Sequence, residues 1–238
     1  MKNQRCDKAR QGAAAQPAQA DTSFEFRNAL RLMRSTGHRA ETLRELRDRL
    51  TKVSDGCVVH HTSQYFAKGH ILEYTNDFAQ WVGESLEEGA LAEQLSNIDP
   101  YSFDSTGELR SEIIRVIDSF LENFPEPRRV LPGDEFYFNE SLTFIFPVGL
   151  RARNLAEFLM ALKYLDPGSL YYHFYEARMR LGRGKDDFSK WIDEVVGARD
   201  VAAMISGIDP FMHNIEGIRE HLTEIIEEAL RREMEAMA

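Results

Sequence analysis

The sequence contains one pattern written twice, and both halves must therefore satisfy the same fold. Residues 24–61 align without a gap with residues 136–173, at an offset of 112, and eleven of the 38 aligned positions are identical. After a two-residue deletion the match resumes at an offset of 110, where an Asp-Phe-x-x-Trp motif and an Ile-Asp-Pro motif recur. A repeat of this length indicates tandem duplication of a whole module rather than a short solenoid unit.

The repeat predicts how the chain divides. Residues 1–22 are rich in alanine, glutamine and charge and lack periodic apolar positions, so we expect a disordered tail. Its basic residues leave a mitochondrial presequence as an alternative interpretation. Residues 23–124 form the first copy of the module, residues 125–133 a proline-rich linker, and residues 134–238 the second copy.

Each copy opens with an extended segment. Aromatic and β-branched residues at even spacing predict a strand that ends at Gly149, and the first copy carries the pattern more weakly before Gly37. A lone strand leaves its ladder groups unpaired. We therefore expect the two strands to pair across a pseudo-two-fold axis, or through a homodimer. Such an interface would bury four aromatic side chains, those of Phe136, Phe138, Phe144 and Phe146.

Helices follow the strand in both copies. Thr42-x-x-Glu45 and Asn154-x-x-Glu157 are capping boxes that predict a helix start. Asp-Pro pairs end a short helix in each copy, and a long closing helix follows. The predicted ranges are 92–98, 109–121, 202–208 and 218–234. The expected fold is α+β and predominantly helical, with one strand or hairpin plus about five helices per copy.

The composition excludes several classes of protein. A formal net charge of -10 argues against nonspecific nucleic-acid binding, which requires a basic face. No apolar run reaches the length of a membrane span. The two cysteines, Cys6 and Cys57, imply no disulfide framework, because one lies in the tail and the other aligns with Ser169. We expect a soluble, cytoplasmic protein.

The motifs resemble those of a known family. The run from Ser169 to His173, the Asp-Phe-Ser-x-Trp motif ending at Trp191 and the Ile-Asp-Pro motif ending at Pro210 recur in modified form in the first copy. Together they resemble an uncharacterised prokaryotic family built from this module in tandem. A similar module is appended to some bacterial signalling and phosphoenolpyruvate-synthase-like proteins, which implies a sensing or docking role. The resemblance assigns no activity and no catalytic residue.

Two histidines are the leading candidates for a site. His61 and His173 occupy aligned positions, and each is followed by an aspartate, Asp77 or Asp187. Together these side chains offer nitrogen and oxygen donors that suit zinc or a similar ion. The alternative is a buried histidine whose ring bonds to the start of the Asp-Phe-x-x-Trp helix. The two aspartates themselves fit helix N-caps.

A second candidate site lies in the basic stretch from Arg178 to Lys185. Its glycines would let a phosphate approach the backbone, and Arg180 and Arg183 could bind it, although a solvated loop is the simpler interpretation. Glu140 is a further candidate, because the sequence gives it no structural role.

Two functional hypotheses follow. The first is a non-catalytic binding or regulatory protein that acts through a protein partner or a small ligand and that dimerises. The second is a metal- or phosphosugar-handling enzyme with its site between the copies, formed by both histidines and both aspartates with an arginine clamp. No cofactor is implied by any motif.

Overall fold

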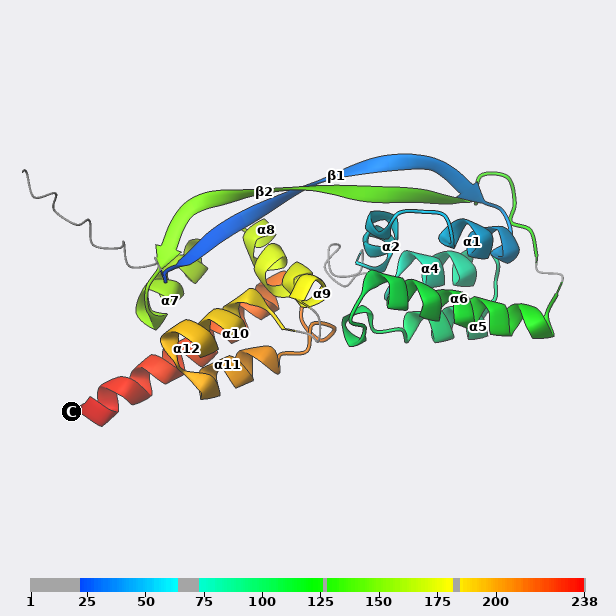
Figure 1. Cartoon of the computed structure of the whole chain (residues 1–238). Helices are drawn as coiled ribbons and strands as arrows, with labels where there is room; N and C mark the ends of the chain where they lie inside the picture. The colour runs from blue at the N-terminus through cyan, green and yellow to red at the C-terminus, as the bar shows by residue number, and fades with distance from the viewer. Residues whose placement is uncertain (1–21, 64–72, 126–127, 182–184, 238) are drawn as a thin grey trace, which may run out of the picture.

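The computed structural model describes residues 22–63, 73–125, 128–181 and 185–237. The protein is α+β and mostly helical. Two groups of helices lie side by side beneath one long two-stranded ribbon (Figure 1). We call them the first lobe and the second lobe. The expected disordered tail lies outside the described residues, apart from Thr22.

The ribbon consists of β1 (Phe24–Ala40) and β2 (Phe136–Ala152), each of 17 residues. The strands are antiparallel, and Phe24 pairs with Ala152 while Ala40 pairs with Phe136. Pairing of the two strands within one chain is thus confirmed. Both strands run past the glycines that were expected to end them. Gly37 and Gly149 adopt φ values of 74° and 78° where the register shifts, so they form bulges that bend the strands without ending them.

The first lobe contains the helices between the two strands. They are α1 (Leu43–Leu50), α2 (Asp55–Thr62), α4 (Asp77–Glu84), α5 (Gly89–Ser96), η1 (Pro100–Ser102) and α6 (Thr106–Asn123). Thr42 caps α1 by accepting from the Glu45 amide at 3.2 Å. The Glu45 carboxylate reaches the amide of Glu41, one residue earlier than a standard capping box.

The second lobe contains the helices after β2. They are α7 (Leu155–Tyr164), α8 (Pro167–Leu170), the π-helical η2 (Tyr171–Glu176), α9 (Ala177–Leu181), α10 (Asp187–Trp191), the π-helical η3 (Ile192–Val196), α11 (Arg199–Ser206) and α12 (Ile215–Met237). Asn154 caps α7 as expected, at 2.9 Å from the Glu157 amide. Among the described helices, none combines the length and the hydropathy that crossing a lipid bilayer would require.

The strands are exchanged between the lobes. Phe24 and Phe26, at the start of β1, belong to the core of the second lobe, where both rings pack against Phe158. Phe136 and Phe138, at the start of β2, belong to the core of the first lobe. Each hydrophobic core is therefore completed by a strand from the other half of the sequence.

One expectation about burial was wrong. Phe136 and Phe138 are buried, but Phe144 and Phe146 expose 55% and 45% of their surface. The reason is architectural, because Phe144 and Phe146 lie in the part of β2 that spans the distance between the lobes, whereas Phe136 and Phe138 lie at the end that packs on the first lobe (Figure 1).

Candidate functional site

His173 connects three parts of the chain. Its Nδ1 lies 2.9 Å from Oδ2 of Asp187, and its Nε2 accepts a hydrogen bond from the backbone amide of Arg27 at 2.8 Å. Because Nε2 is the acceptor, the proton of the neutral ring belongs on Nδ1, which donates to the carboxylate. The ring is 3% exposed and packs among Phe24, Phe26 and other aromatics.

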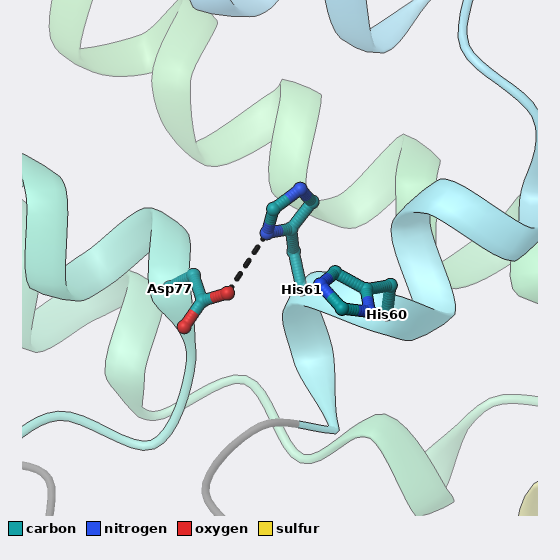
Figure 2. A group of neighbouring side chains, drawn as sticks. All are labelled: His60, His61 and Asp77. Atoms are coloured by element: carbon teal, nitrogen blue, oxygen red, sulfur yellow. Dashed lines mark hydrogen bonds and ion pairs between the residues drawn. The ribbon is translucent and has the colours of Figure 1, made fainter. Parts of the chain in front are cut away.

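His61 makes the same contacts in the first lobe. Its Nδ1 lies 2.8 Å from Oδ2 of Asp77 (Figure 2), and its Nε2 accepts from the amide of Asn139 at 3.0 Å. Arg27 and Asn139 are themselves 112 residues apart. Each histidine therefore ties an aspartate of its own lobe to the backbone of the strand that comes from the other half.

The interpretation of Asp77 and Asp187 as N-caps was wrong by one residue. The caps are Asn76, which accepts from the Ala79 amide at 2.9 Å, and Asp186, which accepts from the Ser189 amide at 2.7 Å. The following aspartate is the first residue of each helix. Its carboxylate is not needed for capping and faces the histidine.

The two tryptophans are core residues with internal hydrogen bonds, as the sequence suggested. The Trp81 indole donates to the carbonyl of Asp134 at 2.7 Å, and the Trp191 indole donates to the carbonyl of Thr22 at 3.0 Å. Both acceptors lie two residues before the start of an exchanged strand. The tryptophans thus fix the point at which each strand enters the opposite lobe.

The first lobe offers one possible group of metal ligands. Donor atoms of His60, His61 and Asp77 all lie within 4.8 Å of one another (Figure 2). An ion on Nδ1 of His61 would replace the bond to Asp77 and shift the ring proton to Nε2, opposite the Asn139 amide, which is also a donor. The Nδ1 atom of His60 lies 2.7 Å from the Ser141 hydroxyl. The hydrogen bonds therefore favour a structural role for His61.

The sites that the enzyme hypothesis combined are not brought together. His61 contacts Phe78, Phe136 and Phe138 of the first core, whereas His173 lies in the second. Glu140 has a structural role that the sequence did not reveal. It accepts from the hydroxyl of Ser54, the N-cap of α2, at 2.6 Å and pairs with Arg34.

A cavity of about 340 Å³ opens beside His173, between the exchanged strand β1 and the second lobe. Its lining includes the cations of Arg27, Arg180 and Lys190 and the rings of Tyr172 and Trp191. The volume falls in the range of small-ligand sites. Another surface hollow, of about 390 Å³, has no aromatic lining.

The carboxylate of Asp187 is held ionised in this cavity. Burial alone would raise its pKa, but the hydrogen bond from His173 and the charge of Arg180, which bonds to it at 2.8 Å, together lower it. Burial lowers the pKa of His173, against the opposing effect of Asp187. The pair is thus a neutral imidazole and a charged carboxylate near pH 7.

The basic stretch does not form one anion site. Arg178 is turned into the core, where its guanidinium lies over the Phe174 ring at 4.3 Å and near Asp186 at 3.5 Å. Arg180 points to the cavity, and Arg183 lies outside the described residues. The helix α9 therefore directs Arg178 and Arg180 to different environments.

Two residues of the cavity were not predicted from the sequence. Arg27 reaches the second lobe only because β1 is exchanged, and Lys190 lies in the Asp-Phe-Ser-Lys-Trp motif at a position that is glutamine in the first copy. The sequence feature that could have identified Lys190 is this difference between the two halves, lysine in one and glutamine in the other, beside residues that match.

Comparison with known proteins identifies relatives of nearly the whole chain. OrfY from Thermoproteus tenax has a solved structure that matches with a TM-score of 0.72 and 34% sequence identity, covering 89% of this chain and 97% of that one. A search of curated proteins found no match. Residues 21–227 match a family described as a family of unknown function, DUF5752. The chain therefore belongs to the DUF5752 family.

Proposed function

We propose that this chain is a non-catalytic binding protein that takes a small anionic ligand in the cavity beside His173. The observation that carries the proposal is the convergence of three cationic side chains, those of Arg27, Arg180 and Lys190, on one cavity with aromatic walls. Phosphate or carboxylate groups are the ligands that such side chains bind best.

The cations retain capacity for a ligand. Arg27 pairs with Glu25 at 3.0 Å and Arg180 pairs with Asp187, but each guanidinium has five N–H groups and these pairs use only some of them. Lys190 has no ion-pair partner within the described part of the chain. Glu25, Asp187 and Glu194 also line the cavity, so a ligand with a hydroxyl donor beside its anionic group fits best.

The hydrogen bonds around His173 support binding rather than catalysis. A general base needs a ring nitrogen that can take a proton from a substrate. The Nε2 atom of His173 is occupied by the Arg27 amide, and Nδ1 by Asp187. Using Nε2 in a reaction would break the contact that holds the exchanged strand in place, and using Nδ1 would break the contact with Asp187.

We infer further that the two halves are copies of one module and that only the second lobe, with its exchanged strand β1, carries this cavity. At the positions aligned with Arg27 and Lys190, the first lobe has Asn139, from the exchanged strand β2, and Gln80, which carry no charge. The histidine–aspartate–amide contacts recur in both lobes, whereas the cations do not. One lobe would then bind the ligand while the other supports the fold.

Thermal unfolding in the presence of phenyl phosphate tests the proposal. A ligand at a hundred times its dissociation constant stabilises the folded state by about 2.7 kcal/mol, which raises the unfolding midpoint by several degrees. We expect this rise in the wild type and a smaller one in Lys190→Gln and Arg27→Asn, which introduce the residues found at the aligned positions of the first lobe. The matched control is Lys52→Gln, an exposed lysine of the first lobe.

Two results would contradict the proposal. If phenyl phosphate raised the unfolding midpoint equally in all variants, or did not raise that of the wild type, the cavity would not be an anion site. Release of inorganic phosphate from phenyl phosphate, abolished by His173→Gln, would show that the site is catalytic.

A further inference from the structure

The cavity beside His173 adjoins the surface hollow of about 390 Å³. Lys190 of α10 and Glu194 of η3 line both spaces, which therefore meet along these two side chains. We call the space that is also lined by Lys185 and Arg199 the side hollow. A ligand that occupies the cavity thus has room to continue past Lys190 into the side hollow.

The side hollow adds two cations to those of the cavity. Lys185 and Arg199 line the side hollow and do not line the cavity. Lys185, like Lys190, forms no ion pair with any residue that the structure describes. The Arg199 guanidinium lies 3.6 Å from the Asp193 carboxylate, which is too far for a hydrogen bond, so its N–H groups are available to a ligand.

The first lobe has hydrogen bonds at the place that corresponds to the side hollow. The amide of Thr75 donates to the Ser96 hydroxyl at 3.0 Å, and the Thr75 hydroxyl donates to the Ser96 carbonyl. The residues aligned with this pair are Lys185 and Ser206, and both line the side hollow. These bonds join the start of α4 to the end of α5 in the first lobe, whereas the corresponding residues of the second lobe border an open space.

The cations around the side hollow belong to the second lobe alone. Three aligned positions read Thr75, Gln80 and Gly89 in the first lobe and Lys185, Lys190 and Arg199 in the second. The acidic residue between them is common to both lobes, since Glu194 aligns with Glu84. On a chain whose net charge is -10, three cations around one hollow create a local positive potential that attracts anions.

We propose that the ligand is an organic bisphosphate, with one phosphate group in the cavity and the other in the side hollow. This proposal rests on the anion site proposed above and adds the class of ligand. A phosphate group carries about -1.5 to -2 charge near pH 7 and three acceptor oxygens, so it needs several donors. Arg27 and Arg180 supply them in the cavity, Lys185 and Arg199 supply them in the side hollow, and Lys190 serves either group.

The boundary between the two spaces determines the separation of the phosphate groups. Lys190 and Glu194 are four residues apart, which is about 6 Å along a helix. A single six-membered ring with phosphates at opposite positions spans a distance of this order. Because the Glu194 carboxylate repels phosphate, the neutral body of the ligand lies beside it and the two phosphate groups lie on either side.

Isothermal titration calorimetry with phenyl phosphate and 1,4-phenylene bisphosphate tests the proposal, because these probes differ only in the second phosphate. We expect the wild type to bind the bisphosphate about tenfold more tightly, as one further set of charge-assisted hydrogen bonds provides. Lys185→Thr, which introduces the residue of the first lobe, should lower the affinity for the bisphosphate to that for phenyl phosphate. Glu194→Gln should raise it, because a repelling charge is removed. Lys52→Gln is the matched control.

The failure of this proposal is distinguishable from failure of the anion site. If phenyl phosphate did not bind to the wild type, both proposals would be wrong. If the wild type bound the two probes equally, or if Lys185→Thr kept the preference for the bisphosphate, the side hollow would not take a second phosphate, while the cavity would remain an anion site. Circular dichroism checks that each variant is folded, and loss of folding cannot produce the opposite effects expected for Lys185→Thr and Glu194→Gln.

Discussion

His173 accepts a hydrogen bond from the backbone amide of Arg27 at 2.8 Å, although the two residues are 146 positions apart. This bond joins the strand of one half to the helices of the other, and the pair of His61 and Asn139 repeats it in the first lobe. The histidines thus hold the exchanged strands in place.

Replacement of His173 should destabilise the protein. His173→Ala leaves the Arg27 amide and the Asp187 carboxylate without their partner and opens a space among aromatic rings, which together cost about 3 kcal/mol. Urea unfolding at neutral pH measures the change. The control His38→Ala alters an exposed side chain and should stay within about 0.5 kcal/mol of the wild type. If the two substitutions lowered the free energy of unfolding equally, His173 would not hold the exchanged strand in place.

Mild acid should weaken the fold through the same histidine. Burial lowers the pKa of His173 in the folded protein, so the unfolded chain binds a proton first as pH falls below about 6.5. Its stabilising contribution is complete above that value and is lost as pH falls toward the folded pKa. The free energy of unfolding should therefore decrease between pH 7.5 and pH 6, and His173→Asn should flatten this dependence. If the free energy of unfolding of the variant depended on pH as that of the wild type does, other titratable groups would cause this dependence.

Because the strands are exchanged, a substitution in β1 should destabilise the second lobe. Phe26→Ala removes a fully buried ring from the second core and should cost about 4 kcal/mol. Hydrogen exchange should show protection falling first in α7 and α10, although Phe26 belongs to the first half of the sequence. Phe138→Ala, the aligned substitution, should act first on α1 and α4. The reverse assignment would refute the exchange.

Cys57 should be chemically inert in the folded protein. Burial raises the pKa of its thiol to about 12, and the thiolate is the reactive form. Iodoacetamide should therefore leave Cys57 unmodified under native conditions and alkylate it in denaturant, as peptide mass spectrometry would detect. Rapid native alkylation would mean that α2 opens readily.

Divalent metal should not be needed for the fold. The ring nitrogens of His61 are both hydrogen-bonded, so a chelator should leave the unfolding midpoint unchanged and zinc should not raise it. A zinc-dependent rise that His60→Ala removes would instead establish a metal site at His60, His61 and Asp77.

Local patterns predicted local structure well. The caps at Thr42 and Asn154 depend on residues a few positions apart, and both form. The assignment of Asp77 as a cap was wrong because Asn76, the residue before it, has the extended backbone that a cap requires and accepts from the Ala79 amide. The expected end of the strands at Gly37 was wrong because glycine also permits a bulge.

The candidate site was only partly predictable. His173, Asp187 and Arg180 were found from sequence, because they lie close together in one copy. Arg27 was missed, since it reaches the cavity from the other half of the chain. Glu140 was singled out without a role, and its contact with Ser54 spans 86 residues that no local pattern can bridge.

The sequence by itself determined that two similar halves exist, that each opens with an extended segment followed by capped helices, and that a histidine, an aspartate and a tryptophan recur in both. These features follow from the periodicity of apolar residues and from contacts between side chains and backbone groups a few residues away. Only the tertiary structure decided that the strands are exchanged, that each histidine holds the backbone of the other half, and that the middle of the ribbon remains exposed. These depend on which distant surfaces meet, and that choice is set by the free energy of packing the whole chain.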